Sequence, residues 1–329
     1  MAGLGPERVI APPAALRAVA RSDEAIAVVT SSAVVLTGFD GTPLRTIVLS
    51  DTPSTAAAVA SDGHSFLVTW LTGGAFHAAL LNGDAIQPID VADPPAATSL
   101  LAVFDGTRYI VFAAKTGLII STAGVVEERF PLAVPLSAAT VAGGRVLVAW
   151  TLDDGKIEQL DVAELADHGM TAAVRVKSQV STLLSGGGLW LMGSVALAPG
   201  YVAWSRLPGY VWLAEGSQLS ADLTPIDAHR LSANTSLGNM IDHVGVAALP
   251  AGFLVVWQYT CHCFGYDGVW GALVDASGQP REELKIRRGG LAPFVVTLPD
   301  GGVAIVYGAD EGIILRVFDS APRRRVVTR

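Results

Sequence analysis

A short apolar phrase, usually closed by an aromatic residue, recurs seven times along the chain. The copies are Phe66–Trp70, Val146–Trp150, Phe253–Trp257, Tyr201–Trp204 and Val303–Tyr307, with degenerate copies that end at Thr30 and Ala113. Their last residues are 37 to 54 residues apart. Periods in this range are typical of supersecondary units that stack side by side, so the repeat predicts the architecture.

Each period contains about four short apolar segments separated by turn residues. In the second period the turns contain Asp62-Gly63, Gly73-Gly74 and Asn82-Gly83, which supply the positive φ angles of tight hairpins. The segments between these turns are short and rich in Val, Leu, Ala and aromatic residues, which is typical of strands. They are Thr55–Ala60, Ser65–Trp70, Ala75–Leu81 and Ala85–Val91.

The segments of one period differ in polarity. The second segment is apolar on both faces, as in Tyr109–Phe112, which indicates a strand covered on both sides. The fourth is more charged, as in Arg281–Lys285, and suits an outer strand in contact with water. Radially packed sheets satisfy both patterns. We therefore predict an all-β fold, a seven-bladed β-propeller of four-stranded antiparallel blades, as a single domain over residues 1–329.

Three alternatives stay open at this point. Because the copies at Thr30 and Ala113 are degenerate, six or eight blades are also compatible with the repeat, and so is a pair of β-sandwiches. Either Arg8–Pro13 or Arg325–Thr328 could supply the outer strand that closes the ring. We favour the N-terminal segment, since it resembles Ile89–Pro95, the outer strand and exit turn of the second period.

The phrase itself, Asp-Gly followed by an apolar strand that ends in Trp, resembles the repeats of secreted bacterial β-propellers. The resemblance covers nearly the whole chain and implies a soluble, extracytoplasmic bacterial protein. Repeats of the WD type fit less well, because no Trp is followed by Asp. Residues 1–13 lack the features of a signal peptide, so the protein is either cytoplasmic or has lost a leader that this chain does not include.

Composition narrows the function classes. The net charge of −8 and pI near 5.2 argue against nucleic-acid binding. Residues are 51% hydrophobic, yet no apolar run reaches the roughly 18 residues that span a bilayer, so we expect no membrane insertion. Two cysteines provide no disulfide framework.

Three long connections are expected on one face of the ring, the face that carries the blade-to-blade links and the turns between second and third strands. We call it the long-loop face; the connections are Ser178–Gly193, Ser232–Asp242 and Gln258–Gly268, around blades five and six. Long loops on a rigid scaffold often carry binding sites. The predicted binding residues are Trp190, Asn239, Asp242, His243, Tyr259, His262, Phe264, Tyr266 and Trp270. The alternative is that the loops fold over one another and bury these rings. A fourth insertion, Val162–Met170, lies on the opposite face, where we expect one helical turn.

Cys261-His262-Cys263 is the most unusual tripeptide. Two thiolates and an imidazole are ligands that zinc or copper accepts, but structural zinc normally takes four ligands with a wider cysteine spacing. Ordinary loop thiols or a Cys261–Cys263 disulfide are the other interpretations, and we assign no metal or cofactor.

The first strands should line a central channel, which is where propeller enzymes generally carry out their chemistry. Arg17 and His243 are their only titratable residues, with Asp242 at the edge, and no carboxylate pair suited to glycoside cleavage is present. Small residues on these strands predict a closely packed centre. We expect a non-enzymatic binding or scaffold propeller for a protein or carbohydrate partner, or a component of a larger surface assembly. The alternative is a hydrolase or lyase acting on a carbohydrate or small ester through Asp242, His243 and His262.

Overall fold

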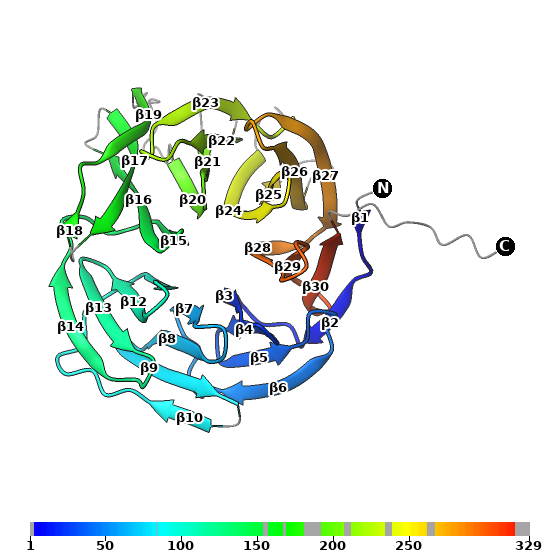
Figure 1. Ribbon diagram of the computed structural model, residues 1–329. Coiled ribbons are helices and arrows are strands. Elements are labelled where there is room, and N and C mark those ends of the chain that lie inside the picture. Colours follow the sequence, from blue (N-terminus) through cyan, green and yellow to red (C-terminus); the bar gives the residue numbers. More distant parts are fainter. Residues whose placement is uncertain are drawn as a thin grey trace.

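The computed structural model describes residues 3–83, 85–153, 157–166, 169–180, 192–206, 212–233, 239–261 and 267–319. In this part of the chain seven antiparallel sheets form a closed ring, and the first strand of each sheet faces the centre (Figure 1). The prediction of an all-β, seven-bladed propeller of four-stranded antiparallel blades is confirmed.

The blades follow one another in chain order. Blade one contains β3 (Leu16–Arg21), β4 (Ile26–Thr30), β5 (Ala33–Thr37) and β6 (Pro43–Val48). Blade two contains β7 (Ala56–Ser61), β8 (Phe66–Thr72), β9 (Ala75–Asn82) and β10 (Ala85–Pro88). Blade three contains β11 (Leu100–Phe104), β12 (Arg108–Ala113), β13 (Thr116–Ser121) and β14 (Val126–Pro131). Blade four contains β15 (Ala138–Ala142), β16 (Arg145–Asp153), β17 (Ile157–Ala166) and β19 (Val174–Val180), with the short β18 (Gly169–Met170) paired to β17.

The remaining blades contain the longest inner strands. Blade five contains β20 (Met192–Ala198), β21 (Tyr201–Arg206), β22 (Leu213–Leu219) and β23 (Pro225–Arg230). Blade six contains β24 (Asn239–Leu249), β25 (Gly252–Cys261), β26 (Gly268–Asp275) and β27 (Pro280–Arg288). Blade seven contains β28 (Leu291–Thr297), β29 (Val303–Ala309) and β30 (Gly312–Asp319), joined by β1 (Gly3–Leu4) and β2 (Arg8–Ala11).

The seven copies of the apolar phrase all fall in second strands, namely β4, β8, β12, β16, β21, β25 and β29. These strands are buried on both faces because each sheet packs between two neighbours. The core is accordingly divided into seven clusters, one at each blade-to-blade interface. Between blades five and six, for example, the rings of Tyr201 and Phe253 stack with their centroids 4.6 Å apart.

The ring is closed by the N-terminal segment, as predicted. Strands β1 and β2 pair with successive parts of β30, so residues from the start of the chain form the outer strand of blade seven (Figure 1). Glu7, between these strands, ties the seam together. Its carboxylate accepts a hydrogen bond from the Tyr307 hydroxyl at 3.0 Å and pairs with Arg287 and Arg316. Residues 325–328, the other candidate for this position, lie outside the described residues.

One local prediction is wrong. The insertion at residues 162–170 was expected to form a helical turn, but β17 continues to Ala166 and pairs with β18 in an extended hairpin. The strand pairing of blade four thus simply runs further than in its neighbours. Within the described ranges no helix is long and apolar enough to cross a bilayer.

Candidate functional site at the channel mouth and the long-loop face

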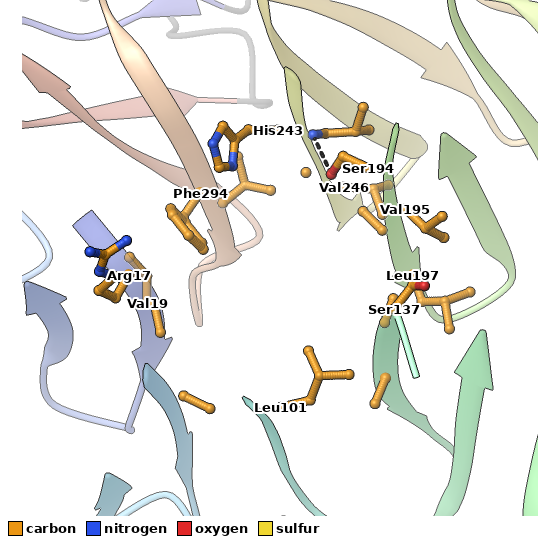
Figure 2. Close-up of a pocket in the computed structure, with 18 of the residues that line it drawn as sticks. Arg17, Val19, Leu101, Ser137, Ser194, Val195, Leu197, His243, Val246 and Phe294 are labelled. Carbon is orange, nitrogen blue, oxygen red and sulfur yellow. Dashed lines mark hydrogen bonds between the residues drawn. The ribbon is translucent and has the colours of Figure 1, made fainter. Parts of the chain in front are cut away.

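A central cavity of about 320 Å³ lies between the first strands of all seven blades (Figure 2). This corrects the prediction of a closely packed centre. The small residues of these strands were expected to let the sheets meet at the axis, but a seven-blade ring leaves space that Ala and Val side chains do not fill. Arg17 and His243 were predicted to be the titratable residues that line the channel, and among the described lining residues they are the only ones.

The first strands of four consecutive blades are bulged where they start, at the long-loop face. The register shifts between Leu16 and Ala18 in β3 and between Asp242 and Val244 in β24, and β20 and β28 shift in the same region. The first strands of blades two, three and four pair without a shift. A bulge adds one residue and redirects its side chain. In β3 and β24 the extra residues are Arg17 and His243.

His243 adopts a left-handed backbone conformation, with φ of 49°. This conformation is unfavourable for a residue with a side chain and is characteristic of functional or strongly constrained positions. The imidazole reaches the solvent of the channel, but the protein packed around it removes hydration and lowers its pKa below the ordinary value of 6.5. The Asp242 carboxylate opposes this shift, and the Arg17 guanidinium reinforces it.

Arg17 is a cation without a paired anion in the described part of the chain. One of its terminal nitrogens donates a hydrogen bond to the Ser54 carbonyl oxygen at 3.0 Å. Its Nε is buried and has no hydrogen-bond partner, and no described carboxylate forms an ion pair with it. Arg17, Phe294 and His243 follow one another along one wall of the channel (Figure 2).

Side-chain hydrogen bonds hold the bulged starts of β24 and β28 together. The Thr260 hydroxyl donates to Asp242 Oδ2 at 3.0 Å, and Gln258 Nε2 donates to Thr260 Oγ1 at 2.8 Å. Gln258 Oε1 accepts the backbone N–H of Ala292, also at 2.8 Å. The carboxylate of Asp242 is therefore part of a structural chain that links blade six to blade seven.

A second link joins blades five and six. Ser194 Oγ accepts the backbone N–H of Val244 at 2.9 Å, next to His243 (Figure 2). The N–H of Ser194 donates to Ser205 Oγ at 3.0 Å. These bonds satisfy backbone groups that the bulges leave outside the ladder. No local sequence pattern pointed to Ser194, Gln258 or Thr260, because the bonds that tie them to Val244, Ala292 and Asp242 cross between strands or blades.

On the long-loop face the described β24–β25 hairpin of blade six is longer than the β7–β8 hairpin of blade two. Ten residue pairs join β24 to β25, against six between β7 and β8. Four of these pairs lie beyond Trp257 towards the long-loop face, against one beyond Trp70 in blade two, and the three further pairs add about 10 Å there at about 3.3 Å per residue. Exposed apolar side chains occur at this end of the strands. Met240 is 42% exposed, and Leu291, at the start of β28, is 54% exposed.

The structure describes only some of the predicted binding residues. Asp242 and His243 lie together at the channel mouth. Trp270 is half-buried, and the Lys285 ammonium lies 5.4 Å from the centre of its ring. The backbone of Asn239 pairs with that of Cys261 at the far end of the hairpin. The others, Trp190, His262, Phe264 and Tyr266, lie outside the described residues.

Tyr259 requires a correction, because its ring is not available at the surface. It is 1% exposed and packs edge-on against Trp257 and Trp270. Burial raises the pKa of its hydroxyl to about 12. The ring of Tyr259 is therefore part of the core and not of an exposed binding surface. The pattern of strand β25 explains why, since Trp257 and Tyr259 are two residues apart and so share one face of the sheet.

The residues that could bind a metal are only partly described. Among the described residues no group of three or more His, Cys, Asp or Glu side chains is arranged to hold a metal ion. His262 and Cys263 lie outside that part of the chain, so the Cys261-His262-Cys263 tripeptide stays a weak candidate.

Solved structures with the same fold include proteins of unlike names. Kuenenia stuttgartiensis hydrazine synthase matches with a TM-score of 0.62 and 12% sequence identity, over 95% of this chain and 96% of that chain. The β-propeller domain of Myceliophteria thermophila Cps50 (Swd1) matches with a TM-score of 0.60 and 12% identity, over 96% of this chain and 100% of that domain. At such low identity the likeness shows the fold alone. No protein-family model matches the chain, and no curated protein matches it in sequence.

Proposed function

We propose that this protein is a non-enzymatic binding or scaffold β-propeller that recognises a protein or carbohydrate partner through the long-loop face over blades five and six. The observation that carries the proposal is the lengthened β24–β25 hairpin, whose far end presents the exposed Met240. A rigid ring with one lengthened edge offers a contact surface that needs little ordering when a partner binds.

The hairpin and the strands next to it offer apolar, aromatic and cationic groups for contact with a partner. Met240 and Leu291 offer flexible and branched apolar contacts to a protein. Trp270, with Lys285 over its ring, offers an aromatic face and a cation of the kind found at interface centres. The titratable groups of the cavity are too few for the paired-carboxylate chemistry of glycosidases, which favours recognition over catalysis.

The test is a capture experiment with paired surface variants. The immobilised protein is offered a glycan array and the soluble proteins of its source organism. The variant Met240→Asp/Leu291→Asp places two charges on the proposed surface. The control Val48→Asp/Val125→Asp replaces two exposed apolar residues, 68% and 59% exposed, on strands β6 and just before β14 at the outer rim. The proposal requires a ligand that the wild type and the rim control retain and the long-loop variant loses. Loss by the rim control alone would reject this surface.

A second candidate function is a hydrolase or lyase for a carbohydrate or small ester. The observation that favours it is His243, which lies at the channel mouth next to Asp242 and whose pKa is lowered from the ordinary histidine value by the surrounding protein. Turnover of p-nitrophenyl esters or oligosaccharides by the wild type, abolished in His243→Gln, would establish it. Absence of turnover with partner capture intact would leave the binding function.

We also propose an extracytoplasmic location, in keeping with the resemblance of the repeats to secreted propellers, and membership of a surface assembly as a second form of the scaffold role. Fractionation of source cells with an antibody against the protein tests the location. Detection confined to the cytoplasmic fraction would contradict it.

A further inference from the structure

The central cavity combines an apolar wall with a single cationic edge. Val19, Leu101, Val195 and Leu197 line it, together with Phe294 (Figure 2). No Asp or Glu is among its described lining residues, although the chain has a net charge of −8. Arg17, its permanent cation, and His243, which becomes cationic on protonation, both lie at the mouth on the long-loop face. The cavity is thus a local exception to the acidic character of the protein.

We infer that the cavity binds a small organic carboxylate, with the carboxylate at Arg17 and His243 and the apolar body against Phe294 and the Val and Leu side chains of the wall. The volume of about 320 Å³ lies at the small end of the range of about 300–1,000 Å³ that ligand pockets occupy. This site lies in the channel, whereas the partner contact proposed above uses Met240 and Leu291, and the inference does not rest on that partner, although His243 belongs to the same strand as Met240.

The main support for this inference is the guanidinium of Arg17. A guanidinium presents five N–H donors, and in the described part of the chain only one hydrogen bond, to Ser54, is accounted for. A cation that lacks a described counter-ion and borders an apolar cavity gains most from an anion that enters the cavity. A carboxylate matches the planar fork of the guanidinium, whereas an inorganic anion would leave the apolar wall unused.

His243 adds a dependence on pH. The charged groups that act on its imidazole are Arg17, across blade seven, and the adjacent Asp242, whose carboxylate accepts the Thr260 hydroxyl. Protonation of His243 adds a second positive charge at the mouth. Because a carboxylate stays ionised well below the ordinary pKa of histidine, affinity should rise as the pH falls from about 7.5 to about 5.5.

The experiment is a titration of the full chain with benzoate and hexanoate, followed by calorimetry and by NMR. Acetate lacks the apolar body, benzamide lacks the charge, and phosphate lacks both the apolar body and the planar shape. We expect saturable binding of benzoate or hexanoate and much weaker binding of the other three. Arg17→Gln should weaken it about tenfold or more, the loss typical of a hydrogen bond to a charged group. Arg17→Lys should retain part of the affinity, and His243→Gln should remove the increase at low pH.

The chain offers a matched control in Arg21, at the other end of β3. Arg21 pairs with Asp23 at 3.8 Å and does not line the cavity, so Arg21→Gln should bind like the wild type. Equal thermal midpoints of the variants would show that each is folded. The inference is overturned if no carboxylate binds saturably, if Arg17→Gln and Arg21→Gln bind equally well, or if phosphate or benzamide binds as tightly as benzoate.

Discussion

Blades two, three and four pack against their neighbours in the same way as blades five, six, seven and one. The two groups differ where their inner strands line the channel. In blades two to four the inner strands β7, β11 and β15 pair in regular register, and their lining residues are Ala, Val and Leu apart from Ser137. In the other four blades each inner strand is bulged at its start, and Arg17, Ser194 and His243 lie there. We call these the regular half and the bulged half.

The comparison separates what stabilises the ring from what gives it chemistry. The second strands of both halves are equally buried, and each blade interface has its own core cluster. One inserted residue per inner strand is enough to replace an apolar wall by a polar mouth, because a shift of one residue reverses the side chain's direction. Function can therefore vary at the strand starts without a change in the core.

The largest expected effects test whether the two cores are equivalent. Trp257→Ala in the bulged half and Phe112→Ala in the regular half each remove a buried ring, 0% and 2% exposed respectively. Each should lower the free energy of unfolding by about 3–5 kcal/mol, measured by urea denaturation. A cost below about 1 kcal/mol for Trp257→Ala alone would mean that the bulged half is loosely packed, contrary to the comparison.

Intermediate effects are expected at two glycines in third strands. A Cβ atom at Gly117, in the regular half, would overlap the Phe130 ring, and one at Gly216, in the bulged half, would overlap the Tyr201 ring. Both Ala variants should be destabilised by about 1–3 kcal/mol in the same assay. Gly169→Ala is the control, because its Cβ would meet only the Ala166 carbonyl oxygen, at an ordinary 3.7 Å. Similar losses in all three variants would exclude steric overlap as the cause.

The smallest effect distinguishes the halves most sharply. Glycine in a regular strand is unfavourable, so Ala58→Gly in β7 should cost about 0.5–1 kcal/mol. At His243 the left-handed backbone already carries a cost that glycine removes, so His243→Gly should change stability by about 0.5 kcal/mol or less. Thermal unfolding of the two variants measures the difference. A larger loss in His243→Gly would show that the imidazole itself stabilises the ring.

The sequence was sufficient for the repeat because strand burial is a local property. The apolar phrases that end at Trp70, Trp150 and Trp257 form second strands. The degenerate copies that end at Thr30 and Ala113 do so as well. The N-terminal closure was also predictable, since Arg8–Pro13 resembles Ile89–Pro95 of the second period. Each of these features depends on the types of residue within a short stretch of the chain.

The site was less predictable because it depends on register between strands. The unusual composition of the loops drew attention to Tyr259, but position within β25 places its ring in the core. Conversely, the sequence identifies Arg17 and His243 as titratable residues of inner strands. Their position at the same mouth of the channel depends on the bulges in β3 and β24, which no local sequence pattern specifies. Ring geometry likewise determines the open cavity, which the small residues of the inner strands did not predict.

The most direct test is the pKa of the His243 imidazole, measured by NMR titration in the wild type, Arg17→Gln and Arg21→Gln. If the bulges bring Arg17 and His243 to one mouth, the wild-type pKa lies below 6.5 and rises when the Arg17 charge is removed, while Arg21→Gln leaves it unchanged. A wild-type pKa at or above 6.5, or the same value in Arg17→Gln, would contradict the shared mouth and the account built on it.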